Sequence, residues 1–138
     1  MSDSNISAPP NFSSSAVIVV DDDEDVRMAI AAYLVSIGYE VVAVGSERQA
    51  FECLVEGRFF AAVVDICMPD RDGLELMDRI ASHGIDCKVI AISGSAGRDV
   101  YLRAAACKGA YAILEKPFDP DLLAQVLTDI QAGRPVAL

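Results

Sequence analysis

Polar residues that could bind a cation or a phosphoryl group follow four separate apolar runs of this 138-residue chain. Asp21 and Asp22 come after the first of these runs, and Asp65, Ser93 and Lys116 come after three later ones. Carboxylates that are brought together repel one another, and a nearby cation relieves that repulsion. Neither histidine nor cysteine is suitably placed among these residues, and an all-oxygen ligand set favours Mg²⁺ over zinc.

Asp65 is the best candidate for a nucleophile in this set. It stands alone after its apolar run, whereas the adjacent pair Asp21 and Asp22 is better placed to hold an ion. Lys116 could pair with Asp65 or bind an incoming phosphoryl group, and Ser93 offers a hydroxyl donor. Together with a metal ion, these groups could compensate the charge on a phosphoryl group during an in-line displacement. The residue types therefore indicate phosphoryl transfer to an aspartate.

The order of the predicted elements explains how these residues can meet. Short apolar runs alternate with segments of helical periodicity. The predicted strands are 16–20, 40–44, 60–65, 88–92 and 110–114, and the predicted helices are 26–37, 47–56, 73–83, 99–107 and 120–130. Strict alternation predicts parallel strands, because each helix supplies a right-handed crossover. We therefore expect an open, doubly wound α/β sheet with these polar residues at the carboxyl ends of its strands, where such sheets bind ligands.

Length and composition predict a single acidic domain. At roughly 100–200 residues per domain the chain has room for one, and its 53% hydrophobic residues are enough for a core. The 21 acidic residues outnumber the 11 basic ones, and no basic patch is present that would attract a nucleic-acid backbone. The four cysteines include no close pair, so we expect reduced, buried thiols.

Neither end of the chain is expected to add to the domain, which we predict over residues 16–132. Residues 1–15 are rich in Ser, Pro and Asn, which predicts a disordered tail. Residues 133–138 are expected to form a short C-terminal tail. No apolar run approaches the ~20 residues needed to cross a bilayer, and the first residues contain no apolar signal core. A cytoplasmic protein without a membrane partner is the expectation.

Several of these residues also have ordinary structural explanations. The acidic run 21–25 could be a solvated turn whose charges favour the start of a helix. Asp72 fits a turn or an N-cap, and the Lys116–Pro117 bond fits a rigid turn with a cis peptide. The single histidine, His83, lies at a predicted helix end, where capping explains it better than a phosphohistidine relay does.

Four segments resemble the receiver domain of two-component response regulators, and in particular the nitrogen-fixation regulator class. They are VVDDDEDVR at 19–27, VVDICMPDRDGLEL at 63–76, AISG at 91–94 and LEKPF at 114–118. The similarity covers residues 17–130. It implies a flavodoxin-like fold, with five parallel strands in the order 2-1-3-4-5 and five helices.

The resemblance also implies roles for individual residues. Asp65 would be the phosphoacceptor, and Ser93 and Lys116 would contact the phosphoryl group. The residues that would bind Mg²⁺ are Asp21, Asp22, Asp65 and, through its backbone carbonyl, Cys67. Members of the family take phosphate from a sensor histidine kinase or a phosphotransfer protein. They catalyse their own phosphorylation and dephosphorylation and are not metabolic enzymes.

One position departs from the family's pattern. Ile113 stands three residues before the lysine, where the family often has a Tyr or Phe that changes rotamer on activation. Tyr111 lies two residues earlier and is expected to share a face of the strand with Ile113, because side chains alternate along a strand. Tyr111 could replace the missing aromatic ring, pack in the core or line an interaction surface.

Two other functions stay open beside a phosphorylation switch. An aspartate-nucleophile phosphatase or phosphotransferase commonly has a second acid two residues after the nucleophile, where this chain has Cys67. An interaction module that is never phosphorylated would be expected to lack one of the acids or the lysine. A phosphorylation-dependent homodimer also stays open. We expect either a stand-alone regulator or the receiver of a longer DNA-binding regulator, since no helix-turn-helix follows residue 130.

Overall fold

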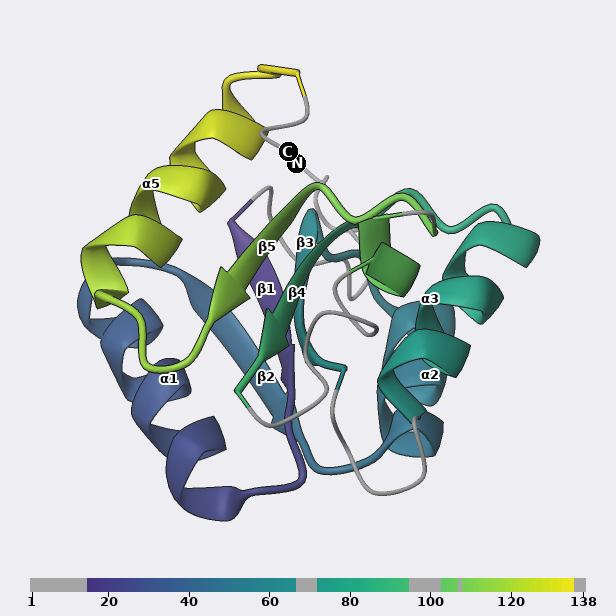
Figure 1. Cartoon of the computed structure of the whole chain (residues 1–138), viewed down its shortest axis with the longest axis horizontal. Coiled ribbons are helices and arrows are strands. Elements are labelled where there is room, and N and C mark those ends of the chain that lie inside the picture. The colour runs from purple at the N-terminus through teal and green to yellow at the C-terminus, as the bar shows by residue number, and fades with distance from the viewer. Residues whose placement is uncertain (1–14, 67–71, 95–102, 107, 136–138) are drawn as a thin grey trace, which may run out of the picture.

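The computed structural model describes residues 15–66, 72–94, 103–106 and 108–135 (Figure 1). The strands are β1 (Ala16–Val20), β2 (Glu40–Val44), β3 (Ala61–Asp65), β4 (Lys88–Ser93) and β5 (Ala112–Glu115). The helices are α1 (Glu24–Ser36), α2 (Glu47–Glu56), α3 (Asp72–Ser82) and α5 (Pro120–Gln131). Residues 103–106 are also helical, and they fall within the helix predicted at 99–107, the rest of which lies outside the described residues.

The strands form one parallel sheet in the order β2-β1-β3-β4-β5. This confirms the doubly wound, five-stranded sheet with the predicted strand order. From β1 the chain first passes to β2 on one side and then returns to β3 on the other. Ligand crevices of such sheets lie at the carboxyl ends of the strands on either side of this reversal, which directs attention to the ends of β1 and β3.

Helices cover both faces of the sheet and enclose two apolar cores. In Figure 1, α1 and α5 lie on one side of the sheet and α2 and α3 on the other. Alternate residues of β1 face the two sides: Ile18 and Val20 pack toward α2 and α3, while Val17 and Val19 pack toward α1 and α5. The strand is buried throughout, as expected for a parallel sheet covered on both faces.

The helix boundaries agree with the predicted ones to within two residues, and capping accounts for the largest difference. Helix α1 begins at Glu24, earlier than predicted, because the Asp23 side chain accepts hydrogen bonds from two N–H groups of the first turn. Part of the acidic run therefore has the helix-start role expected of it. Ser46 caps α2, accepting from the Gln49 N–H, and Asp119 caps α5.

The prediction that Tyr111 and Ile113 share a face is wrong. Strand β5 begins at Ala112, so Tyr111 precedes the regular pleat and the alternation of side chains does not extend to it. Tyr111 packs with Ala112 and Leu114 in the core beneath α1 and α5, whereas Ile113 packs in the opposite core. At 3% exposure, Tyr111 is a buried residue and does not stand in the position of the missing aromatic.

Two further sequence predictions concern cysteines and membrane spans. Cys87 is buried and Cys53 half-buried, and both are free thiols; the other two cysteines lie outside the described residues. Burial raises the pKa of the Cys87 thiol to about 12, so this thiol stays protonated and packs as a small apolar side chain. In the part of the chain that the structure describes, no helix is long and apolar enough to span a bilayer.

Candidate functional site

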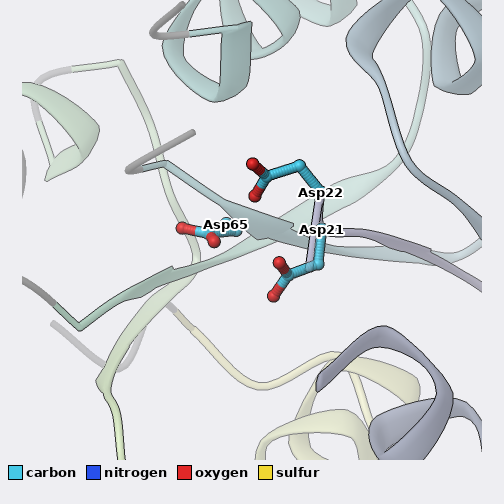
Figure 2. A group of neighbouring side chains, drawn as sticks. All are labelled: Asp21, Asp22 and Asp65. Atoms are coloured by element: carbon cyan, nitrogen blue, oxygen red, sulfur yellow. The ribbon is translucent and has the colours of Figure 1, made fainter. Parts of the chain in front are cut away.

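Three aspartates meet at the carboxyl ends of β1 and β3. Val20, the last residue of β1, pairs with Val64 of β3, so that Asp21 and Asp65 follow on neighbouring strands. One oxygen from each of Asp21, Asp22 and Asp65 lies within 4.8 Å of the others, and their carboxylates reach toward the same side (Figure 2). Asp21 and Asp65 are 1% and 6% exposed, whereas Asp22 is exposed, which leaves the cluster open to solvent on one side.

Lys116 brings a positive charge to two of these carboxylates. Its Nζ donates to Oδ2 of Asp21 at 3.0 Å and to Oδ2 of Asp65 at 3.2 Å. Burial by itself lowers the pKa of Lys116, but the hydrogen bond to Asp21 and the negative charges of Asp65 and Asp21 outweigh burial and raise it. The ammonium is therefore firmly protonated and joins β5 to the ends of β1 and β3.

Gly94 makes room for the stem of this lysine. A Cβ atom at Gly94 would lie 2.9 Å from Cβ and 3.0 Å from Cδ of Lys116, closer than such carbon atoms approach. A similar contact exists at the start of α3, where a Cβ at Gly73 would lie 2.4 Å from the carbonyl oxygen of Asp65. Both glycines of the sequence motifs thus let other parts of the chain pack directly against site residues.

Asp21 is held in place by bonds to its backbone and its side chain. The Asp23 N–H donates to Asp21 Oδ1 at 2.9 Å, and Nη1 of Arg27 donates to the Asp21 carbonyl oxygen at 2.9 Å. Burial raises the pKa of the Asp21 carboxyl, and the charge of Asp65 adds to this, against the opposing effects of the Asp23 amide and Lys116. Sequence reasoning included Arg27 in a motif but did not foresee this positioning contact.

The donor set fits a hard divalent cation. Three carboxylates facing one ammonium leave two negative charges when all are ionised, which a divalent ion would balance. All the ligand atoms are oxygens, and one side of the cluster is open, so that a bound ion could keep several water molecules, as Mg²⁺ usually does. The residues present therefore suit Mg²⁺.

Comparison with known proteins agrees with this geometry. Residues 17–128 match the family model of the response regulator receiver domain. This chain belongs to that family. The receiver domain is 30% identical over 116 residues to the DNA-binding transcriptional regulator NtrC of Azospirillum brasilense, covering 84% of this chain and 24% of that protein. The chain thus spans about a quarter of the length of this relative.

Solved structures similar to the receiver domain have the same fold. A CheY-like receiver domain protein from Methanospirillum hungatei is 27% identical with a TM-score of 0.77, covering 88% of this chain and 98% of the other. The beryllofluoride-activated receiver domain dimer of NtrC4 is 32% identical with a TM-score of 0.77, covering 86% and 98%. These likenesses support the predicted relation to receivers of nitrogen regulators.

The remaining predicted residues are placed as follows. Ser93, the last residue of β4, is buried, and its carbonyl oxygen accepts from the Lys116 N–H at 2.8 Å, so it lies beside the lysine. Cys67 is outside the described residues. The Lys116–Pro117 bond is cis, as expected. His83 follows α3 with Nδ1 2.9 Å from the Arg79 carbonyl oxygen, in agreement with its predicted place at a helix end.

Proposed function

We propose that this receiver domain accepts a phosphoryl group on Asp65 from the phosphohistidine of a sensor histidine kinase or phosphotransfer protein, with Mg²⁺ as cofactor. The observation that carries the proposal is the contact of Lys116 with Asp65 beside the Asp21 and Asp22 carboxylates. A nucleophilic carboxylate, a cation ligand set and a fixed ammonium are the parts that phosphoryl transfer to aspartate requires.

In the transfer step, a carboxylate oxygen of Asp65 attacks phosphorus and forms the O–P bond. The P–N bond of the phosphohistidine breaks, and its electron pair returns to the imidazole, which takes up a proton. Bound Mg²⁺ would supply positive charge to the phosphoryl oxygens. Lys116, 3.2 Å from Asp65, would then donate to an oxygen of the new phosphoryl group, with the Ser93 hydroxyl as the second donor. Attack of water on phosphorus would break this O–P bond, release inorganic phosphate and restore the carboxylate.

The proposed Mg²⁺ ligands are Asp21, Asp22, Asp65 and the backbone carbonyl of Cys67. Asp21 is the best positioned of them, because the Asp23 amide and Arg27 fix its side chain and its carbonyl group. Asp22 is exposed and would complete the set from the solvent side.

The free thiols of Cys53 and Cys87 suit a reducing compartment, and we place the function in the cytoplasm.

An apolar groove next to Lys116 is the docking surface we propose for the phosphodonor protein. Two adjoining hollows between α1 and the connection from β5 to α5 share Ala29, Ile30 and Phe118 as lining residues. The hollow nearer the site also includes Gly94 and Lys116. A helix of the donor protein lying in this groove would bring its phosphohistidine toward Asp65, because the groove ends at the lysine that contacts that aspartate.

Phosphorylation would change which proteins this domain binds. One similar structure is an activated receiver dimer, which favours a phosphorylation-dependent homodimer as one form of the output. A module that is never phosphorylated is less well supported, because Lys116 contacts both Asp21 and Asp65. An aspartate-nucleophile phosphatase is less well supported, because the residue two positions after Asp65 is Cys67 and not a second acid. Sedimentation velocity with and without the acyl phosphate distinguishes a dimer from a monomer that binds another partner.

The proposed function is tested by intact-mass spectrometry after incubation with Mg²⁺ and acetyl phosphate. We expect the mass to rise by one phosphoryl group in the wild type and in Asp78→Asn, a control on the exposed face of α3. The Asp65→Asn variant should show no increase, because it lacks the nucleophilic carboxylate. Equal labelling of Asp65→Asn and the wild type would refute the assignment.

A further inference from the structure

Tyr111 links the sheet to the chain that leaves α5. Its ring is buried beneath α1 and α5, and its hydroxyl donates to the carbonyl oxygen of Arg134 at 3.0 Å. The contact joins residues 23 positions apart, at the end of β5 opposite to Lys116. Nothing in the proposed phosphoryl chemistry uses it.

The turn that receives this bond is closed mainly by its own local contacts. Gly133 has a φ of 74°, which reverses the chain after α5. The Arg134 N–H donates to the Asp129 carbonyl oxygen at 3.0 Å, and the Arg134 guanidinium pairs with the Asp129 carboxylate. A hollow lined by Lys88, Ile130 and the turn itself lies beside Tyr111. The turn is thus incompletely packed against the sheet, so the hydrogen bond from the Tyr111 hydroxyl contributes more to holding the turn in place.

Strand β5 connects this bond to the candidate site. It is an edge strand, paired only with β4 among the described residues. Backbone bonds fix both of its ends to β4: the Tyr111 N–H donates to Val89 at 2.7 Å, and the Lys116 N–H donates to Ser93 at 2.8 Å. Only the four residues of β5 separate Tyr111 from Lys116. The strand is therefore a short, direct connection between the residue that bonds to Arg134 and the lysine of the candidate site.

We infer that Tyr111 and the turn 132–135 form a clasp that holds the chain leaving α5 and that responds to the position of β5. That Tyr111 holds this turn follows from the hydrogen bond of its hydroxyl to Arg134. The response of the clasp to β5 rests on the proposed function. On phosphorylation, Lys116 would move from the carboxylates to the phosphoryl group, and this movement would displace β5. The clasp then makes the direction of the outgoing chain depend on the state of Asp65.

Amide hydrogen exchange at Arg134, measured by NMR, tests the clasp. Tyr111→Phe keeps the buried ring and removes only the hydroxyl. We expect Arg134 exchange to become about fivefold faster, as for the loss of one ordinary hydrogen bond. Tyr39→Phe is the matched control, because the Tyr39 hydroxyl also bonds to the end of α5, at Gln131; it should leave Arg134 unchanged. Equal exchange rates in Tyr111→Phe and the wild type would overturn the clasp.

The coupling to the site is tested by repeating the measurement with Mg²⁺ and acetyl phosphate. Arg134 exchange should change at least about twofold in the wild type and stay constant in Tyr111→Phe, while the mass of both proteins rises by one phosphoryl group. A mass increase without a change at Arg134 would overturn the coupling but not the phosphorylation. Absence of the mass increase would refute the proposed function and the coupling with it, while the first measurement still decides on the clasp.

Discussion

At the scale of single residues, Lys116 holds the candidate site together. The lysine is 24% exposed at its side chain and lies between two carboxylates that are almost fully buried. Asp21 and Asp65 are close enough to repel each other, and the raised pKa of Asp21, caused first by burial and also by the charge of Asp65, reflects that cost. The ammonium offsets part of the repulsion through its contacts with both carboxylates.

Lys116→Ala should separate metal binding from the response to phosphorylation. Without Mg²⁺ we expect the free energy of unfolding to fall by about 2 kcal/mol, because two buried acceptors lose a charged donor. Added Mg²⁺ should still bind, as measured by calorimetry, and restore part of that stability. Phosphorylation-dependent partner binding should be weakened. Lys108→Ala removes an exposed ion pair with Asp78 and serves as control; if both variants behaved alike, Lys116 would have no special role.

Cys87 makes stability depend on pH in the alkaline range. Its pKa is raised by burial to about 12 in the folded protein, against ~8.5 for an unperturbed thiol. The folded state keeps the proton that the unfolded chain loses, so the stabilisation is fully present below pH ~8.5 and is lost as pH rises toward 12. Between pH 8 and 10, the wild type should lose about 1–2 kcal/mol more than Cys87→Ala in urea unfolding. Parallel pH profiles of the two proteins would contradict this.

At the scale of elements, the arrangement of α1 and β5 positions both the lysine and the groove. The parallel register sets Asp21 beside Asp65, and the extension of β5 beyond Glu115 brings Lys116 across the end of β4. Helix α1 contributes in two ways, since Arg27 on it fixes the Asp21 carbonyl and Ala29 on it lines the groove. The same helix thus supports the site and the proposed docking surface.

Ala29→Asp should distinguish protein donors from small phosphodonors. A carboxylate placed in the apolar groove costs desolvation on docking, so phosphotransfer from a phosphorylated histidine kinase that labels the wild type should slow by about tenfold. Labelling by acetyl phosphate, which needs no groove, should be unchanged. Ala32→Asp adds the same charge at another exposed position of α1 and should leave both rates unaltered. A loss of both reactions in Ala29→Asp would contradict the assignment of the groove.

At the scale of the whole molecule, charge and fold act together. The formal net charge is −10, and three of the acidic groups converge on one edge of the sheet. A divalent cation bound there is favoured both by its ligands and by the general negative potential of the protein. Because a ligand that binds only the folded state stabilises it, metal binding should be visible as thermal stabilisation.

Mg²⁺ should raise the melting temperature of the wild type and not that of Asp22→Asn. Asp22 is exposed, so its replacement should leave folding intact in metal-free buffer. At 100 times the dissociation constant, the expected stabilisation of the wild type is about 2.7 kcal/mol. Asp25→Asn, an exposed substitution of the same charge nearby, should behave as the wild type does. An equal Mg²⁺ shift in Asp22→Asn would show that the ion binds elsewhere.

The sequence by itself determined the order of elements, the parallel sheet and the residues at its carboxyl edge. These features depend on local periodicity and on the rule that parallel strands end at the same edge, so the sequence alone predicts that Asp21, Asp22, Asp65 and Lys116 lie at one edge of the sheet. The role of the acidic run at the start of a helix, likewise a local property, was also predicted, and Asp23 caps α1.

Only the tertiary structure decided which of these groups touch and where side chains outside the regular elements point. The double contact of Lys116 joins residues 95 and 51 positions apart, and the Arg27 contact depends on how α1 packs on β1. The side of the sheet that receives Tyr111 was predicted wrongly, because the pleat that fixes alternation starts one residue after it. Such contacts depend on packing between elements, which no local pattern of residues contains.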